Sequence, residues 1–157
     1  MQTPSTRLAT PADLDAVAAL FDQYRQFYEQ APDLQAARTF IAARMANAES
    51  VIWLGHDAQG QVGGFCQLYP SFCSVAAAPI LVLYDLFVAP TARRSGLARA
   101  LISAAQNYAT AQGVARMDLT TAHSNGQAQA LYLSMGWQPD TVFRAFNWTP
   151  QPANSTA

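Results

Sequence analysis

The sequence predicts an α/β domain built around a mixed β-sheet. The chain has 157 residues, of which 51% are apolar and 12% charged, so it can bury a sizeable core and is too apolar to be disordered. Segments with helical spacing of apolar residues alternate with short apolar runs that end at turn residues. Their order, β-α-α-β-β-β-α-β-α-β, is typical of α/β domains. We expect one domain over residues 1–148 and a disordered polar tail over 149–157.

The first half predicts a strand, two helices and a hairpin. Residues 7–9 form a short strand, and Thr10 then caps a helix that runs to residue 28 with Pro11 in its first turn. A second helix covers 34–48. The hairpin pairs residues 51–56 with 61–69, and Pro70 is expected to end its second strand.

The second half predicts a buried strand followed by two helix–strand pairs. Residues 80–88 read ILVLYDLFV, which is apolar on both faces and therefore indicates a strand inside the sheet. One charge, Asp85, interrupts it. A helix is expected between Gly96 and Gly113, since a glycine commonly follows the end of a helix. The remaining elements are a strand at 117–121, a helix at 125–135 and a last strand at 142–148.

Charge and composition exclude several classes of protein. The net charge of −1 gives no overall attraction to nucleic acid or to an anionic membrane. The polar N-terminus is no signal peptide, and no apolar stretch reaches the roughly 20 residues that span a bilayer, so we expect a cytoplasmic protein. The two cysteines lack metal-binding or redox spacing, and no metal is expected. Residues 79–157 carry five arginines and three acids, against four and seven in residues 1–78, which favours an anionic ligand in the second half.

A cluster of arginines marks the start of the third predicted helix. The chain has no lysine, yet Arg93, Arg94 and Arg99 surround Gly96 in the stretch TARRSGLARA. A helix start with spare backbone N–H groups and nearby cations can hold phosphate. The stretch is neither a Walker loop nor a G-x-G-x-x-G fingerprint. The alternative reading is an ordinary helix start with solvated arginines.

A second stretch strengthens the phosphate interpretation. Residues 124–137 read SNGQAQALYLSMGW, a pattern N-x-x-A-x-x-x-Y-x-x-x-G-W whose Asn125 lies 32 residues after Arg93. Together the two stretches resemble the GNAT superfamily of acyl-CoA-dependent N-acetyltransferases over about residues 6–148. The resemblance implies a mixed sheet of about six to seven strands flanked by four helices. The stretch YDLFV and the spacing are similar to the polyamine and yeast histone acetyltransferase branch.

The resemblance also implies the roles of individual residues. Backbone amides at the end of the strand would hold the pantetheine arm of acetyl-CoA, and amides at the helix start would hold its pyrophosphate, with added charge from Arg93 or Arg94. Asn125 would contact the cofactor within the motif that includes Ala128, and Tyr132 would protonate the departing thiolate. The backbone positions implied are Leu86, Phe87, Val88, Arg94, Ser95, Gly96, Leu97, Ala98 and Arg99.

The position of the general base departs from the pattern of the similar branch. The similar branch has a glutamate where this chain has Tyr84, and Asp85 is the nearest carboxylate. Strand alternation puts Tyr84 and Asp85 on opposite faces, so either one, or a water, remains a candidate for taking the proton of the acceptor. The missing glutamate also weakens the case for a polyamine, which calls for several carboxylates.

The sequence therefore predicts transfer of an acetyl group from acetyl-CoA to a primary amine of a small molecule or a protein. No Cys-His or Ser-His pair stands out, which favours direct attack in a ternary complex over a covalent enzyme intermediate. A homodimer is expected, as is common in the similar branch. The alternatives are a module that binds acetyl-CoA without turnover, as a sensor would, and a domain that keeps only the fold.

Overall fold

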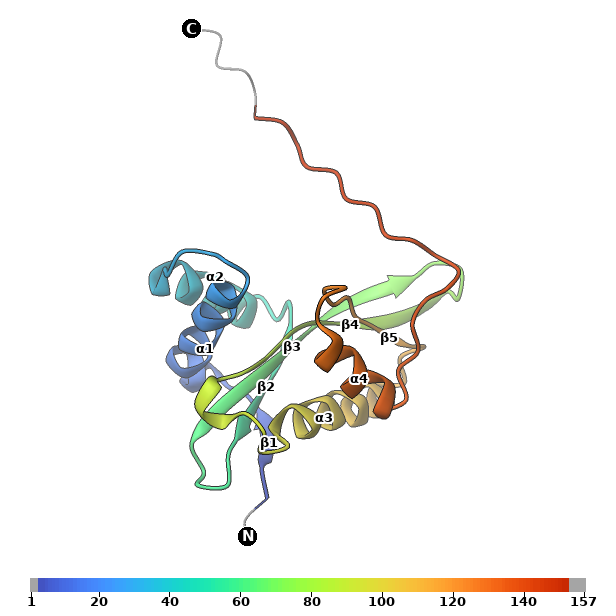
Figure 1. Cartoon of the computed structure of the whole chain (residues 1–157). Helices are drawn as coiled ribbons and strands as arrows, with labels where there is room; N and C mark the ends of the chain where they lie inside the picture. Colours follow the sequence, from blue (N-terminus) through green and yellow to red (C-terminus); the bar gives the residue numbers. More distant parts are fainter. Residues whose placement is uncertain (1–2, 153–157) are drawn as a thin grey trace, which may run out of the picture. The chain divides into compact units, whose positions relative to one another are not determined.

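The computed structural model describes residues 3–152, which divide into two compact units, one ending at Thr120 and the other beginning at Thr121. The first unit contains a mixed sheet with the strands in sequence order (Figure 1). The first four strands pair antiparallel, and the fifth pairs parallel to the fourth, as the predicted mixed sheet requires. The strands are β1 (Ser5–Leu8), β2 (Val51–His56), β3 (Val62–Cys73), β4 (Ala78–Val88) and β5 (Met117–Asp118).

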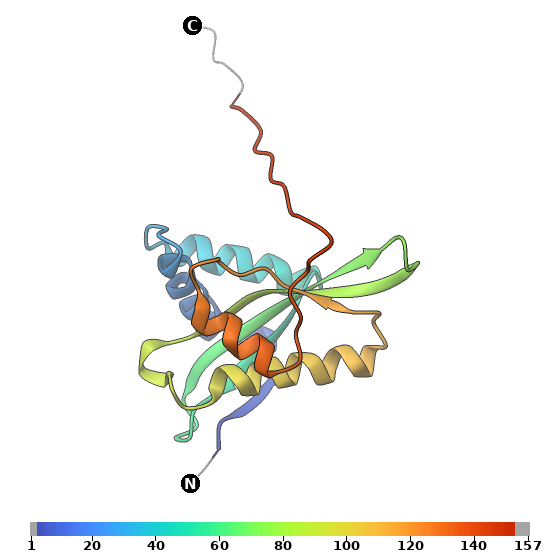
Figure 2. The ribbon, with the colours of Figure 1, turned by 45° about the vertical axis from the view of Figure 1, so that its right-hand side comes forward.

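Helices cover both faces of this sheet. The helices α1 (Leu14–Phe27) and α2 (Leu34–Ala46) lie on one face and α3 (Leu97–Gln112) lies on the other (Figure 2). The core on the first face joins apolar side chains of α1 and α2 to Leu54, Phe65 and Phe87 of three neighbouring strands. Two short 3-10 turns, η1 (Pro11–Asp13) and η2 (Pro90–Ala92), precede α1 and α3.

The start of α1 is fixed by a carboxylate, as the sequence Thr-Pro-x-Asp suggests. Asp13 accepts hydrogen bonds from the Thr10 N–H at 2.8 Å and from two nitrogens of Arg7 at 2.8 Å each. These bonds hold the pKa of Asp13 well below its usual range. The ion pair also ties β1 to the helix that follows it.

The beginning of α3 approaches the sheet closely because glycines face it. A Cβ at Gly63 would lie 2.6 Å from the Cβ of Ala92, and one at Gly55 would lie 2.7 Å from Leu97. Leu97 itself is buried. The glycines of β2 and β3 therefore set where η2 and the first turn of α3 can lie.

Gly63→Ala is expected to lower the melting temperature by about 3–10 °C, because overpacking at a tight contact costs about 1–3 kcal/mol. Thermal unfolding followed by circular dichroism measures the change. The matched control is Gly126→Ala, since a Cβ there meets nothing within 4 Å. Equal melting temperatures for the two variants would show that the contact between Gly63 and Ala92 is not tight.

The predicted end of the hairpin strand at Pro70 is wrong. β3 continues to Cys73, with Pro70 opposite Leu81 of β4. The pairing of β2 with β3 ends at Leu68, so β3 is an edge strand beyond that point. A proline, which lacks only the N–H donor, is tolerated on such an edge.

The sheet has five strands within residues 3–152, not the expected six to seven, because residues 142–148 form no strand. The Asp140 carboxylate accepts from the backbone N–H groups of Val142 and Phe143 at 2.8 and 2.9 Å. A side chain that binds backbone donors in this way forms a local turn that competes with strand pairing. Of the predicted tail, residues 153–157 lie outside the described residues.

The second unit contains one helix, α4 (Gly126–Ser134), at the position that the sequence predicts. Within the described part of the chain, no helix is both long and apolar enough to cross a bilayer.

Candidate active site

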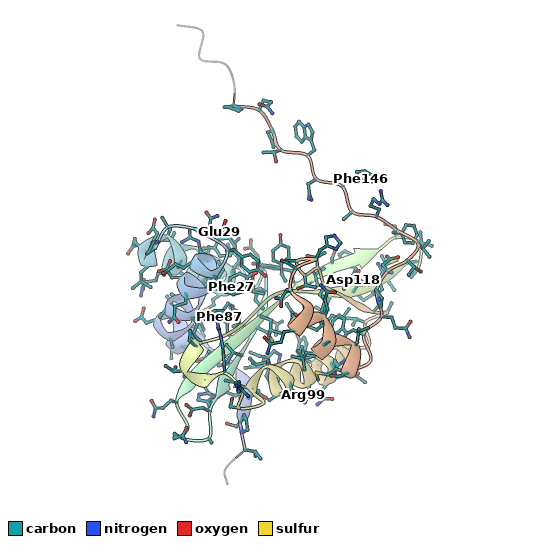
Figure 3. The ribbon with its side chains drawn as sticks, viewed as in Figure 1. Phe27, Glu29, Phe87, Arg99, Asp118 and Phe146 are labelled. Atoms are coloured by element: carbon teal, nitrogen blue, oxygen red, sulfur yellow. The ribbon has the colours of Figure 1, made fainter. Side chains whose placement is uncertain are left out.

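The segment 93–99 folds into a turn and helix start that can hold an anion. Arg94 and Gly96 have positive φ angles of 60° and 83°. Alternation of positive and negative φ along the chain turns successive N–H groups toward one side. The side chain of Ser95 holds the turn by donating to the Ala92 carbonyl at 2.7 Å. The first turn of α3 contains no acidic residue, and a Cβ at Gly96 would meet nothing within 4 Å. Figure 3 marks Arg99 in this first turn.

Arg93 links this turn to the end of β4. Its Nε donates to the Val88 carbonyl at 3.1 Å. A guanidinium is positively charged and has five N–H donors. After this contact, Arg93 can still offer its charge and other N–H groups to an anion at the helix start. Leu97 is buried and Ala98 is half-buried, so both would serve a ligand through the backbone. The residues fit a pyrophosphate group.

The end of β4 has one side without a neighbouring strand. β5 pairs with β4 only at Leu81 and Val82, so among the described residues no strand lies beyond the edge of Leu86, Phe87 and Val88 on that side. Phe87 belongs to the core, where Figure 3 labels it. An extended chain with amide groups, such as a pantetheine arm, can pair with an open strand edge.

Asp85 is a buried carboxylate on the face of the sheet that α1 covers. It is 4% exposed and accepts a hydrogen bond from Gln67 Nε2 at 2.7 Å. The Tyr24 hydroxyl of α1 also interacts with it. Burial raises the pKa of Asp85, while the bonds from Gln67 and Tyr24 act against that rise. A carboxyl with a raised pKa is suited to exchange protons with a substrate.

Tyr84 lies in a different environment from its neighbour. The pairing of β3 with β4 shifts between Gln67 and Leu68, so Tyr84 is an extra residue without a partner on β3, which is a β-bulge. Its side chain is 65% exposed and packs its ring against Tyr69 at 5.4 Å between centroids. Of the two candidate bases, Asp85 is the buried one with hydrogen-bond partners.

Several aromatic rings surround this part of the sheet. Tyr24 packs against Phe87 and Phe65 with centroid distances of 6.3 and 6.0 Å, and against Tyr28 at 5.1 Å. Burial and the Asp85 carboxylate raise the pKa of Tyr69 to about 12 and that of Tyr24 further. Both phenols therefore stay protonated at neutral pH and can donate hydrogen bonds.

Three predicted site residues belong to the second unit. Asn125 precedes α4, and its Oδ1 accepts from the Ala128 N–H at 3.2 Å, which is a helix cap. Tyr132 lies further along α4 and packs against Trp137 at 5.9 Å between ring centroids. The structure thus gives Asn125 and Ala128 a local structural role. Their predicted contact with the cofactor stays a prediction.

The sequence pattern did not reveal Gln67 or Ser50. Gln67 is a fully buried polar residue in the apolar run VGGFCQLY, and the Ser50 hydroxyl donates to its Oε1 at 2.7 Å. An isolated polar residue in an apolar strand was the available signal. Its partners lie 17 and 18 residues away, so only the strand register shows the contact.

Comparisons with known proteins point to one enzyme family. A sequence model of the acetyltransferase (GNAT) family matches residues 15–137. The uncharacterised N-acetyltransferase YhfO of Bacillus subtilis is 47% identical over 137 residues, which are 87% of this chain and 91% of the relative. The D-amino-acid N-acetyltransferase HPA3 of Saccharomyces cerevisiae is 27% identical over 135 residues, with 84% and 83% covered.

A solved structure shows the same fold. The crystal structure of a probable acetyltransferase has a TM-score of 0.88 and 35% identity, and the match covers 95% of this chain and 99% of that one. Acetyltransferases of this family use acetyl-CoA and act on amines. The family match and the relative at 47% identity show that the chain belongs to the acetyltransferase (GNAT) family and is an N-acetyltransferase.

Proposed function

We propose that this N-acetyltransferase transfers the acetyl group of acetyl-CoA to a primary amine by direct attack within a ternary complex. The observation that carries the proposal is the buried Asp85 carboxylate, which precedes the open edge of Leu86 to Val88 on the same strand. The basic turn of residues 93–96 follows that edge after the short turn η2. One strand and its following turn thus supply a base, amide partners and a phosphate site.

In the proposed reaction Asp85 is the general base and Tyr132 is the general acid. The Asp85 carboxylate takes one proton from the acceptor ammonium, through a water because the carboxyl is buried, and so frees the nitrogen lone pair. As the C–N bond forms and the C–S bond breaks, Tyr132, in the role that the family motif implies, would give its proton to the sulfur and regain one from the acylated nitrogen. Backbone amides near Phe87 would stabilise the charge on the carbonyl oxygen. The net products are an amide, the thiol of CoA and one proton.

The acceptor is a small amine, an amino-acid-like compound or a protein amine. The similarity to a yeast D-amino-acid N-acetyltransferase supports an amino-acid-like amine. An ammonium approaching Asp85 would meet the rings of Tyr24, Tyr28 and Tyr69, and aromatic faces attract cations. A cytoplasmic location stays a prediction from the sequence.

The test combines thermal unfolding with a thiol-release assay over a panel of amines. Acetyl-CoA at 100 times its dissociation constant should stabilise the protein by about 2.7 kcal/mol, which corresponds to a rise of about 5–10 °C. Release of free thiol with an amine would support the transferase. Binding without release from any amine would instead indicate a sensor, and no rise in melting temperature would contradict the cofactor site.

Gly96→Glu is expected to abolish binding of CoA, because a carboxylate would lie at the N–H groups proposed to hold the pyrophosphate. Titration calorimetry measures the affinity. The matched control is Gly60→Glu, since Gly60 has a φ of 78° and a Cβ there also meets nothing within 4 Å. Both variants should lose about 1–2 kcal/mol of stability from the positive φ. Unchanged affinity in Gly96→Glu would contradict the phosphate site.

We also propose that the chain forms a homodimer. Four large side chains of the second unit are each at least 80% exposed, which is unusual for apolar residues so close in sequence. These side chains are Val142, Phe143, Phe146 and Trp148. Light scattering on the purified protein measures the mass, and a monomer at micromolar concentration would contradict the proposal.

A further inference from the structure

A chain of two short hydrogen bonds ends at the proposed base. Ser50, directly before β2, donates to Gln67 Oε1 at 2.7 Å, and Gln67 Nε2 on β3 donates to Asp85 Oδ2 on β4 at 2.7 Å. Gln67 has no exposed surface, and Asp85 is 4% exposed. Buried polar groups have large energetic effects because the low local dielectric strengthens each bond and penalises each unpaired group.

The direction of this chain depends on the charge of Asp85. An ionised carboxylate only accepts hydrogen bonds, so Gln67 must turn its NH₂ group toward Asp85. The amide oxygen of Gln67 then faces Ser50, whose hydroxyl rotates to donate to it. In this arrangement each group has a partner of the right kind, and Asp85 is the acceptor. The arrangement therefore matches the form of Asp85 that takes a proton.

We propose that Gln67, held in place by Ser50, is the positioning residue for Asp85, keeping the carboxylate in its charged form and leaving its other oxygen, Oδ1, for the acceptor. The proposal rests on the role of Asp85 in the proposed function. Gln67 touches neither substrate nor cofactor in this role. It acts by binding Oδ2 of Asp85, so that the other oxygen serves the incoming amine.

The surroundings of Asp85 give Gln67 this influence. Tyr24 of α1 interacts with Asp85, and Tyr84 precedes it on β4. The charge of Asp85 also raises the pKa of Cys66 and of Tyr69 on β3. Among the described residues, the groups that shift the pKa of Asp85 are Gln67 and Tyr24, neither of which is a cation. The charge of Arg44, from α2, acts on Tyr69. Burial is therefore opposed by two neutral donors.

Gln67→Met tests the proposal, because it removes the donor and nearly keeps the volume. Loss of a hydrogen bond to a charged group should move the acidic limb of kcat/KM up by about one pH unit, so that activity below the limb falls about tenfold. The titration of the Asp85 carboxyl carbon, followed by NMR, should move in the same direction. Leu68→Met is the matched control at a fully buried neighbour and should move neither.

Ser50→Ala keeps the test valid if Gln67→Met does not fold. It should shift the limb in the same direction by less, and Ser50→Thr should restore it. Unchanged NMR titration in both the Gln67 and Ser50 variants would overturn the proposal. A shifted titration with an unshifted limb would also overturn it, by showing that Asp85 is not the base. Absence of turnover in the unmodified protein would contradict the proposed function alone, since the titration still reports whether Gln67 controls Asp85.

Discussion

Asp85→Asn is expected to lower kcat/KM by about 10²- to 10⁴-fold, the usual contribution of a general base. Asparagine has the shape of aspartate but cannot take a proton from the acceptor. Its oxygen can still accept from Gln67, so the local packing should persist. The affinity for acetyl-CoA should stay the same, because the edge at Leu86–Val88 and the turn at 93–96 are unchanged. Steady-state kinetics and calorimetry measure the two quantities.

The stability of this variant should not fall at neutral pH. The folded chain holds the Asp85 proton to higher pH than the unfolded chain, because burial raises the pKa. Stability is therefore lost as the pH rises from the pKa of Asp85 in the unfolded chain through its higher pKa in the folded chain. A neutral asparagine removes that loss. A melting temperature equal to or above that of the unmodified protein at pH 7, together with the loss of turnover, identifies a catalytic effect.

Asp22→Asn is the matched control for a buried carboxylate. Asp22 on α1 is 7% exposed and accepts from Asp33 N–H at 2.9 Å, from Gln26 at 3.1 Å and from Arg25 at 3.3 Å. It joins α1 to the start of α2, so its loss should reduce stability and leave kcat unchanged. If both variants lost turnover equally, the assignment of Asp85 as base would be wrong.

Periodicity predicted the elements whose ends carry their own signals. Gly96 and Gly113 flank α3 as expected, because a glycine with positive φ is a local requirement. Pro70 misled the prediction, since whether a proline ends a strand depends on the neighbouring strand, and β2 has already ended there. The pattern at 142–148 is also suited to a strand, but Asp140 takes the backbone N–H groups at its start.

The candidate site shows the same division between local and distant information. The basic turn around Gly96 is a contiguous signal, and the structure places it as a helix start. The choice between Tyr84 and Asp85 depended on alternation alone, and the bulge at Tyr84 appears only in the register with β3. Gln67 had no recognisable motif, because its importance comes from two partners that are distant in sequence, Ser50 before β2 and Asp85 on β4. Contacts between strands are set by tertiary packing. A single sequence carries no local pattern that shows which residues will meet.

Tyr132→Phe is expected to reduce kcat by about 10²-fold, at the low end for a general acid. Only the hydroxyl proton is removed, while the ring that packs against Trp137 remains. The effect is modest for this role because a thiol has a pKa of about 8.5, so its anion is already a good leaving group. Affinity for acetyl-CoA should change little, because the ring and the helix cap at Asn125 are preserved.

Tyr108→Phe provides the control for loss of a phenol hydroxyl. Tyr108 lies on α3 and packs against Trp53 of β2 with ring centroids 6.2 Å apart, and neither residue is one assigned to catalysis or cofactor binding. Its kcat should match that of the unmodified protein. A general acid acts only in the transition state, so Tyr132→Phe should reduce kcat and kcat/KM by the same factor. A rise in the dissociation constant of acetyl-CoA by that factor would instead make Tyr132 a binding residue, and the thiolate would then take its proton from water.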